Sequence, residues 1–237
     1  MNQYFEYCRF QAPPRRLLTE AGLAREEFAI RATESGGRLF GCWRSLVGLG
    51  LARDEGIALT SWPTQELLRS APAVDDAEHH VLEATVRPKT DAEVSLDGIS
   101  VFRWFDVPAA DWEAFRDILD AAWPNMEDVF DVNICGFWRS LEIKAPASRT
   151  LLLTRYGDLS VWEASRWWNK PESAAQESMS RFQARNDMIQ STIAFPTLQI
   201  PAVRAASTRS TGWRLAFSKP TLAVRLNLRH NHMSLAS

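Results

Sequence analysis

The chain has 237 residues, of which 46% are hydrophobic and 24% are charged, and its formal net charge is −2. This is the composition of a soluble globular protein with one large or two small domains. No apolar run approaches the ~20 residues that a membrane-spanning helix needs, so we expect no transmembrane segment. The N-terminus also lacks the pattern of a secretory signal or a transit peptide, and we therefore expect a cytoplasmic protein.

The charges are distributed unevenly along the chain. Residues 188–237 contain no Asp or Glu but carry several Arg and Lys residues, so the rest of the chain is acidic. A basic segment of this kind could contact nucleic acid or an anionic membrane. Terminal segments are commonly loose, however. We expect a solvated tail and no nucleic-acid binding.

The three cysteines, Cys8, Cys42 and Cys135, lie inside apolar stretches and form no C-x-x-C pair. Buried thiols behave as small hydrophobic groups, and unpaired cysteines are typical of a reducing compartment. We expect all three to be core residues.

The first half of the chain alternates between strand and helix patterns. Residues 3–10 (QYFEYCRF) are short, aromatic-rich and followed by proline, which predicts a strand. A helical stripe follows, and Gly36-Gly37 can end it. Strands are predicted at 37–46 and 56–62, then a second helix, then a fourth strand near 79–86. The stripe consists of Leu17, Ala21, Ala24 and Phe28.

The second half follows the same order after a polar linker at residues 88–98. A strand at 100–105 precedes a helix that Pro124 is expected to end. Strands at 132–141 and 150–156 precede a second helix, for which Ser160 and Glu163 suggest a capping box. An additional helix is predicted at about 172–187 and a last strand at 191–200. The stripe of the first helix consists of Trp112, Phe115, Leu119 and Ala122.

Two nearly identical hexapeptides reveal an internal repeat. GCWRSL at 41–46 and GFWRSL at 136–141 are 95 positions apart, and the match extends on both sides at the same offset. One deletion later, IALTSW at 57–62 matches LLLTRY at 151–156. Self-similarity over ~100 residues predicts duplicated small domains rather than solenoid units. We predict repeats at 1–87 and 99–202, the linker at 88–98, and a basic tail at 203–237 that is either disordered or adds a strand.

A β-α-β-β-α-β order is that of the ferredoxin-like unit, an antiparallel sheet with both helices on one face. Strands this apolar cannot leave the other sheet face in water. We therefore predict an α+β protein in which two tandem ferredoxin-like (βαββαβ) repeats pack sheet to sheet into a barrel with its helices outside.

The strand-helix-strand opening, the G-x-W strands and the strand ending L-T-R-Y before a Trp-rich helix resemble the NIPSNAP family of the dimeric α+β barrel superfamily. The resemblance covers about residues 3–200 and is clearer in the second repeat. It implies an intrachain dimeric α+β barrel, a pseudo-dimer within one chain. It carries over no catalytic residue, and the chain beyond about residue 205 has no counterpart in it.

The chain contains no P-loop, dinucleotide fingerprint, G-x-S-x-G elbow or H-E-x-x-H motif. His79 and His80 are adjacent and would point to opposite faces of a strand, and His230 and His232 have no third ligand nearby. We therefore predict no metal and no cofactor. Haem handling stays a third hypothesis by analogy with the superfamily, for which an axial histidine would be expected.

Charged groups inside apolar strands are the best candidates for a site. Arg44 and Arg139 of the hexapeptides, with Arg103 and Arg155, occur where the sheet should be mostly buried. A buried guanidinium must be paired or hydrogen-bonded, with Glu6, Asp106 or an anionic ligand as possible partners. For Arg44 and Arg139 we favour a structural role at the junction of the repeats over ligand binding.

The second repeat is the expected place of a ligand pocket because most of the ten tryptophans crowd there. Such residues are more often core than a binding site. In the superfamily, pockets lie between a sheet and its own helices, which the resemblance places in the same repeat. The ligand-pocket candidates are Arg103, Trp138, Arg139, Arg155 and Tyr156; catalytic residues stay unknown.

The sequence does not decide whether the protein is an enzyme. The first hypothesis is a module that binds a small apolar or anionic ligand or a protein partner, because no acid/base or nucleophile set is recognisable. The alternative is a cofactor-independent oxygenase or isomerase that acts on a small aromatic substrate, as some relatives in the superfamily do. Fold analogy cannot choose between them.

Overall fold

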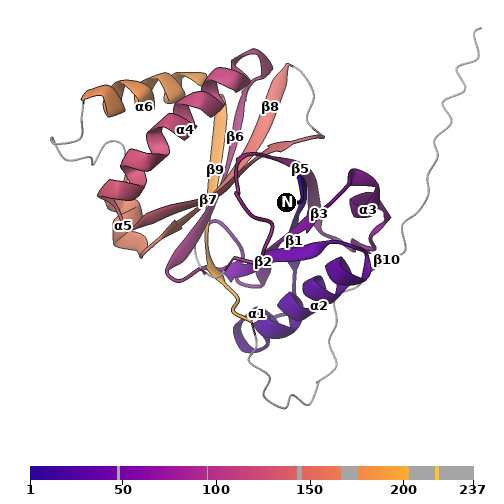
Figure 1. Cartoon of the computed structure of the whole chain (residues 1–237). Helices are drawn as coiled ribbons and strands as arrows, with labels where there is room; N and C mark the ends of the chain where they lie inside the picture. Colours follow the sequence, from indigo (N-terminus) through magenta and orange to yellow (C-terminus); the bar gives the residue numbers. More distant parts are fainter. Residues whose placement is uncertain (47–48, 95, 143–145, 167–175, 203–216, 219–237) are drawn as a thin grey trace, which may run out of the picture.

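The computed structural model describes residues 1–46, 49–94, 96–142, 146–166, 176–202 and 217–218. Eight antiparallel strands close into a barrel in the order β1-β3-β2-β9-β6-β8-β7-β5 (Figure 1). Their bounds are β1 Tyr4–Gln11, β2 Arg38–Ser45, β3 Glu55–Trp62, β5 Glu78–Arg87, β6 Ile99–Pro108, β7 Val132–Ser140, β8 Ala147–Tyr156 and β9 Ser191–Gln199. The predicted α+β class is confirmed.

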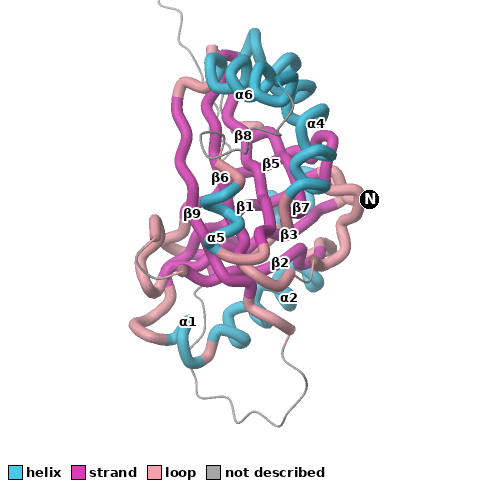
Figure 2. Tube along the Cα trace, turned by 90° about the vertical axis from the view of Figure 1, so that its left-hand side faces the viewer, coloured by secondary structure: helices cyan, strands magenta, loops and turns pink. Residues whose placement is uncertain are grey.

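The helices lie outside the barrel. In both views α4 and α6 cover one side, and α1 and α2 lie on the opposite side (Figures 1 and 2). Their bounds are α1 Arg16–Thr19, α2 Ala21–Glu34, α3 Gln65–Ser70, α4 Trp112–Val129, α5 Leu159–Ala164 and α6 Gln176–Met188, with a 3₁₀ turn η1 at Ala109–Asp111. None of the described helices is long and apolar enough to cross a membrane.

Each half of the chain contributes four neighbouring strands. The first half supplies β5-β1-β3-β2 and the second supplies β9-β6-β8-β7. The halves meet where β2 pairs with β9 and β5 pairs with β7. We expected the sheets of the two halves to pack on each other. Instead, they are hydrogen-bonded to each other at both edges and form one closed barrel wall, so neither has an open edge in the barrel.

Strand alternation separates two kinds of core. Inward-pointing residues such as Phe5, Tyr7, Phe102 and Trp104 fill the barrel. Outward-pointing residues pack beneath the helices, as Phe105 does against Phe115 of α4 in the second half. Since successive side chains of a strand point to opposite faces, one apolar strand serves both cores.

The G-x-W part of the hexapeptides is a packing unit. A Cβ on Gly41 would lie 2.3 Å from the Trp43 indole, and one on Gly136 would lie 2.1 Å from the Trp138 indole. Both indoles are fully buried inside the barrel. Both glycines also follow a register shift in the ladder with the next strand. Glycine is therefore needed at both positions, because the indole two residues later lies where the Cβ of any other residue would be.

The linker is held against the first half and the barrel wall. Val94 donates its backbone N–H to the Phe40 carbonyl at 2.9 Å, and the Gln199 side chain binds the backbone of Val94 and Leu96. Glu93 accepts the guanidinium of Arg25 from α2. The segment between the halves is therefore part of the folded body.

Two local expectations were wrong. Pro124 lies inside α4, which continues to Val129, because the apolar stripe buries Trp123 and keeps Met126 against the sheet. This burial offsets the cost of the one hydrogen bond that proline removes. Asp158, not Ser160, caps α5, and its side chain accepts from the Val161 N–H at 2.9 Å.

Part of the basic tail pairs with the first half. β10 (Phe217–Ser218) forms a two-stranded sheet with β4 (Ala73–Val74), which follows α3. Residues 222–230, which alternate with period two and could form the added strand of the tail, lie outside the described residues, as do His230 and His232.

Candidate functional site

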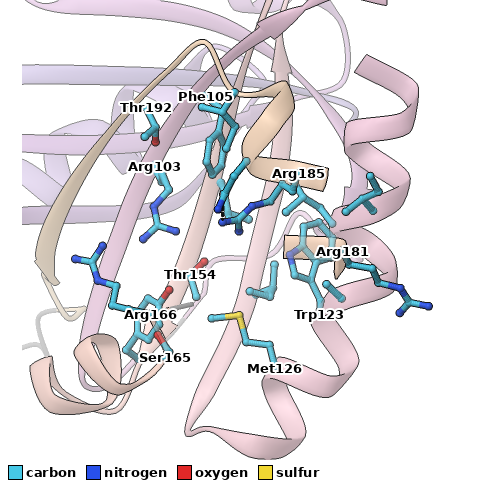
Figure 3. A pocket seen from close by; sticks show the side chains of 18 residues that line it. Arg103, Phe105, Trp123, Met126, Thr154, Ser165, Arg166, Arg181, Arg185 and Thr192 are labelled. Atoms are coloured by element: carbon cyan, nitrogen blue, oxygen red, sulfur yellow. Dashed lines mark hydrogen bonds between the residues drawn. The ribbon is translucent and has the colours of Figure 1, made fainter. Parts of the chain in front are cut away.

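A cavity of about 230 Å³ lies between the outer sheet face of β6, β7 and β8 and the helices α4 and α6 (Figure 3). Most of its wall is apolar, with Phe105, Leu119, Trp123, Ile134 and Leu152 among the lining residues. Its volume is below the roughly 300–1,000 Å³ of drug-sized pockets, so an enclosed ligand must be small. The described tryptophans of the second half therefore leave this space open.

Four arginines line the cavity: Arg103 from β6, Arg166 after α5, and Arg181 and Arg185 from α6. Arg103, Arg166 and Arg185 lie around Thr154, whereas Arg181 points away (Figure 3). Arg181 donates to the Ala121 carbonyl at 3.4 Å. The described lining contains no Asp, Glu or His. Positive charge therefore concentrates at one place in a mostly apolar cavity, where an anion would be favoured.

Arg103 is the most exceptional of these side chains. It is half-buried, and within the described part of the chain its guanidinium makes no hydrogen bond or ion pair. Its electrostatic neighbour is another cation: burial and the charge of Arg103 lower the pKa of Arg185 to about 10, although Tyr156 acts in the opposite direction. The charge of Arg103 thus disfavours the charged form of Arg185, and an anion bound beside them would offset this effect.

Arg166 is held at the rim of the cavity. Its guanidinium lies over the Trp162 ring at 4.4 Å and 3.6 Å from the Glu163 carboxylate. Tyr156 is buried on β8 and lies 6.5 Å from the same indole, measured between ring centroids. The end of α5 thus supplies one arginine and fixes the tyrosine side of the wall.

The structure brings together two of the five candidate pocket residues, because Arg103 and Tyr156 both line the cavity. Trp138 lies inside the barrel, on the other side of the sheet. Arg139 donates to the Ser148 hydroxyl at 3.1 Å and lies over the Trp112 ring at 5.2 Å. Arg155 forms ion pairs with Asp97 and Asp131.

The arginines of the hexapeptides lie on the strands that join the two halves. Arg139 on β7 is opposite Glu83 of β5, and Arg44 on β2 is opposite Leu198 of β9. Neither forms an ion pair with a described residue. The carboxylates that seemed available to them are taken, since Glu6 binds Arg31 and Asp106 binds Arg149.

Sequence reasoning missed Arg166, Arg181 and Arg185. A usable indication was present for two of them, because arginines four residues apart lie on one face of a helix. That face was not recognised as part of a site since nothing in the sequence states which sheet α6 covers.

The first half has a closed ionic cluster on the outer face of its own strands. The Arg31 guanidinium of α2 donates to both oxygens of Glu6 at 2.6 and 2.9 Å, and the Thr60 hydroxyl donates to Glu6 at 3.0 Å. His79 Nδ1 lies 3.0 Å from Glu6, and its Nε2 lies 3.1 Å from the Val74 carbonyl. Arg31 also donates to the Pro72 carbonyl. We call Glu6, Arg31, Thr60 and His79 the Glu6 cluster.

The Glu6 cluster shifts two pKa values in opposite directions. Burial alone would raise the pKa of Glu6, but the bonds from His79 and Arg31 outweigh it and lower that pKa to about 2. Burial would lower the pKa of His79, but the Glu6 carboxylate and the Val74 carbonyl outweigh it, so that pKa is raised. With an acceptor at each ring nitrogen, the imidazolium form of His79 fits this site.

We expect this cluster to make stability depend on pH. The Glu6 contribution is present above the ordinary pKa of 4.5 and is lost as pH falls toward 2, whereas the His79 contribution is present below 6.5 and is lost as pH rises through its folded pKa. In His79→Gln the destabilisation relative to wild type should therefore be larger at about pH 6 than at about pH 9. Urea unfolding at both pH values measures this difference in stability between variant and wild type. The same difference at both pH values would contradict the raised pKa of His79.

The two histidines of the described body do not suit an axial haem role. His79 has both ring nitrogens engaged, and His80 Nε2 lies 3.0 Å from Glu78 while its Nδ1 lies 3.2 Å from Glu142. As alternation predicts, His79 points to the outer face and His80 toward Tyr7 and Trp104 inside the barrel. The His79 ring thus offers no unengaged nitrogen to an iron, and the His80 Nδ1, which makes no hydrogen bond, is buried beside Glu142.

The three cysteine thiols are free and buried, as expected. Burial raises the pKa of Cys42 and of Cys135 to about 12 and that of Cys8 well above its usual value. These thiols stay protonated and unreactive near neutral pH.

Comparison with known proteins identifies the fold. No protein-family model matches the chain, and no curated protein matches it. An anthrone oxidase-like protein of known structure is 11% identical with a TM-score of 0.57, over 87% of this chain and 98% of its own. A suspected monooxygenase from Fusobacterium nucleatum subsp. nucleatum is 10% identical with a TM-score of 0.50, over 84% of this chain and 93% of its own. At such identities the likeness concerns the fold alone: the chain has the dimeric α+β barrel fold seen in monooxygenase-like proteins.

Proposed function

We propose that this protein is a NIPSNAP-like, non-catalytic binding module that takes a small amphipathic anion in the cavity of its second half. The ligand has an apolar, flat or branched body and one anionic group. The body packs against Phe105, Leu119 and Trp123, and the anionic group binds Arg103. A protein partner, the other occupant that the sequence suggested, is not needed to account for an enclosed cavity.

The unpartnered guanidinium of Arg103 is the observation that carries this proposal. Burying a charge without a partner is costly, and proteins normally pair it. Here the surrounding wall supplies further cations and no carboxylate among its described residues. An anionic ligand would offset the cost in the bound state, and arginine suits this role because its planar fork binds two oxygens at once.

The tandem organisation belongs to the same proposal. The strand orders of the two halves correspond, and the aligned parts of the two solved structures exceed either half of this chain. We therefore take residues 1–87 and 99–202 as ferredoxin-like repeats of one ancestral unit, joined by 88–98 and followed by the basic tail at 203–237. The free, buried cysteines support a cytoplasmic location.

Replacing Arg103 by glutamine is expected to weaken anion binding. The probe is 2-naphthoate, and isothermal titration calorimetry measures its affinity. A hydrogen bond to a charged group contributes about 1.5–3 kcal/mol. Its loss should therefore weaken the affinity for 2-naphthoate roughly 10–100-fold. Arg44→Gln is the matched control, because Arg44 is also half-buried on a strand without an ion-pair partner in the described chain but lies outside the cavity.

The control variant should bind 2-naphthoate as tightly as the wild type. If the wild type binds neither 2-naphthoate nor naphthalene-2-sulfonate, or if Arg103→Gln and Arg44→Gln bind equally, the anion site is wrongly placed.

The second candidate is a cofactor-independent oxygenase or isomerase that acts on a small aromatic substrate. The similarity to an anthrone oxidase-like protein favours it, as does the aromatic wall of the cavity. We rank it second because the described lining offers Tyr156 but no carboxylate or imidazole as a base. Oxygen uptake with anthrone is the assay; turnover that is lost in Tyr156→Phe and retained in Arg44→Gln would establish it in place of the binding module.

A further inference from the structure

The first half contains an internal counterpart of the proposed anion site. In the ladder of β1 and β3, Glu6 is opposite Thr60; in the ladder of β6 and β8, Val101 is opposite Thr154. Both pairs lie on the outer sheet face beneath the helices of their own half. The strand registers therefore place Val101 where the first half has Glu6, and Thr154 where it has Thr60.

The Glu6 carboxylate is a fully liganded anion in that position. Its two oxygens receive the fork of Arg31, the Thr60 hydroxyl and His79, all within 3.0 Å. Glu6 and Arg31 are almost completely buried, at 4% and 5% exposed, whereas the His79 side chain is 27% exposed. This outer face thus binds a carboxylate by a threonine hydroxyl on the sheet and a guanidinium above it.

The second half keeps the threonine hydroxyl and lacks the carboxylate, and its guanidinium comes from Arg103 on the sheet, at the register position of Cys8, and not from a helix residue like Arg31. Val101 replaces Glu6. Ala194 takes the place of His79, because Ala194 is opposite Arg103 on β6 just as His79 is opposite Cys8 on β1. Arg103 projects from the same face two residues after Val101. Within the described chain the Thr154 hydroxyl has no hydrogen-bond partner, unlike that of Thr60. Val101 and Ala194 thus put no carboxylate or imidazole beside the two donors, Arg103 and Thr154, which both line the cavity.

We propose that the anionic group of the ligand is a carboxylate that binds between the Thr154 hydroxyl and the Arg103 guanidinium, in the position that the Glu6 side chain occupies in the first half. This inference rests on the proposed function and adds the chemical class of the ligand, a small aryl or branched alkyl carboxylic acid. A carboxylate fits because the internal counterpart is one, and because a planar pair of oxygens matches one guanidinium and one hydroxyl.

The test compares two threonines of the same cavity. Thr154→Val removes the proposed donor without changing the volume, whereas Thr192→Val removes a hydroxyl that already donates to the Trp104 carbonyl at 3.0 Å. Titration calorimetry with 2-naphthoate should show about tenfold weaker binding in Thr154→Val, the loss of one hydrogen bond to a charged group, and little change in Thr192→Val. The neutral analogue 2-naphthamide should bind both variants alike.

A second pair of variants places a carboxylate in the site. Val101→Glu and Val101→Gln add nearly the same volume, so the difference between them reports charge. We expect 2-naphthoate to bind Val101→Glu at least about tenfold more weakly than Val101→Gln, because the internal carboxylate occupies Arg103.

The outcomes separate the two proposals. If 2-naphthoate binding depends on Arg103 but is unchanged in Thr154→Val and equal in Val101→Glu and Val101→Gln, the carboxylate position is wrong and the anion site stands. Tighter binding of naphthalene-2-sulfonate than of 2-naphthoate by the wild type would also overturn the carboxylate assignment. If Arg103→Gln binds 2-naphthoate as the wild type does, the proposed function itself fails.

Discussion

Replacing Glu6 by alanine is expected to lower the free energy of unfolding by about 3–5 kcal/mol, because it leaves the Arg31 guanidinium buried without its counter-ion. The side chains of Arg31 and Glu6 are 3% and 6% exposed, and the Glu6 carboxylate also accepts from Thr60 and His79. Urea denaturation at neutral pH, followed by circular dichroism, measures the effect.

Glu20→Ala is the matched control, because Glu20 also forms an ion pair with an arginine, Arg16, but both side chains are partly exposed. Surface ion pairs contribute about 0–1 kcal/mol. The double variant Glu6→Leu/Arg31→Leu should lose less stability than Glu6→Ala, since it removes both charges. Equal effects of Glu6→Ala and Glu20→Ala would mean that the cluster is not a buried ion pair in solution.

Replacing Gly136 by alanine is expected to cost about 1–3 kcal/mol or more, the usual range for overpacking a close-packed core. The added Cβ would lie 2.1 Å from the Trp138 indole, which is fully buried among Phe5 and Phe40 and has no free space to move into. The register shift between Ile134 and Gly136 also fixes the backbone at this point. Thermal and urea unfolding measure the change.

The specific cause can be tested by a double-mutant cycle. In a Trp138→Phe background the smaller ring no longer occupies the space above Gly136, so Gly136→Ala should cost less there than in the wild type. The equivalent pair, Gly41 and Trp43, should behave in the same way. If the cost of Gly136→Ala is unchanged by Trp138→Phe, the clash with the indole is not its cause.

These two predictions concern the features that make the halves alike and different. The glycine–tryptophan unit occurs in both halves and packs the barrel interior in the same way. The outer faces differ, because the first half closes its face with Glu6, Arg31 and His79 while the second keeps a cavity lined by arginines. The outer faces of one shared barrel therefore differ: one is closed by a buried ionic cluster, and the other holds a cavity.

Much of the secondary structure could be predicted from local patterns. The strands ending near Trp62 and Tyr156 and the helix that Gly36 follows lie where alternation and helical spacing place them. Pro124 and the cap of α5 could not be predicted in this way. In the first case tertiary burial of Trp123 outweighed a local rule. In the second, Asp158 accepts from the Val161 N–H, and the Ser160 hydroxyl donates to Asp158 instead of capping the helix.

The candidate site was predicted only in part. Arg103 and Tyr156 were singled out and line the cavity, because polar residues inside apolar strands are detectable from sequence. Trp138 and Arg139 were grouped with them as neighbours in one motif, yet alternation sends Trp138 into the barrel and Arg139 toward Trp112. Arg185 comes from a helix far along the chain, and no local pattern relates it to β6.

The sequence by itself therefore determined the α+β class of the fold and the residues that the strands carry, and it suggested the internal repeat, because periodicity and spacing are properties of the chain. Only the tertiary structure decided which strand edges join, which helix covers which face, and which arginines line one cavity. Those outcomes depend on contacts between residues distant in sequence, and their energies come from packing and burial of charge that no local window contains.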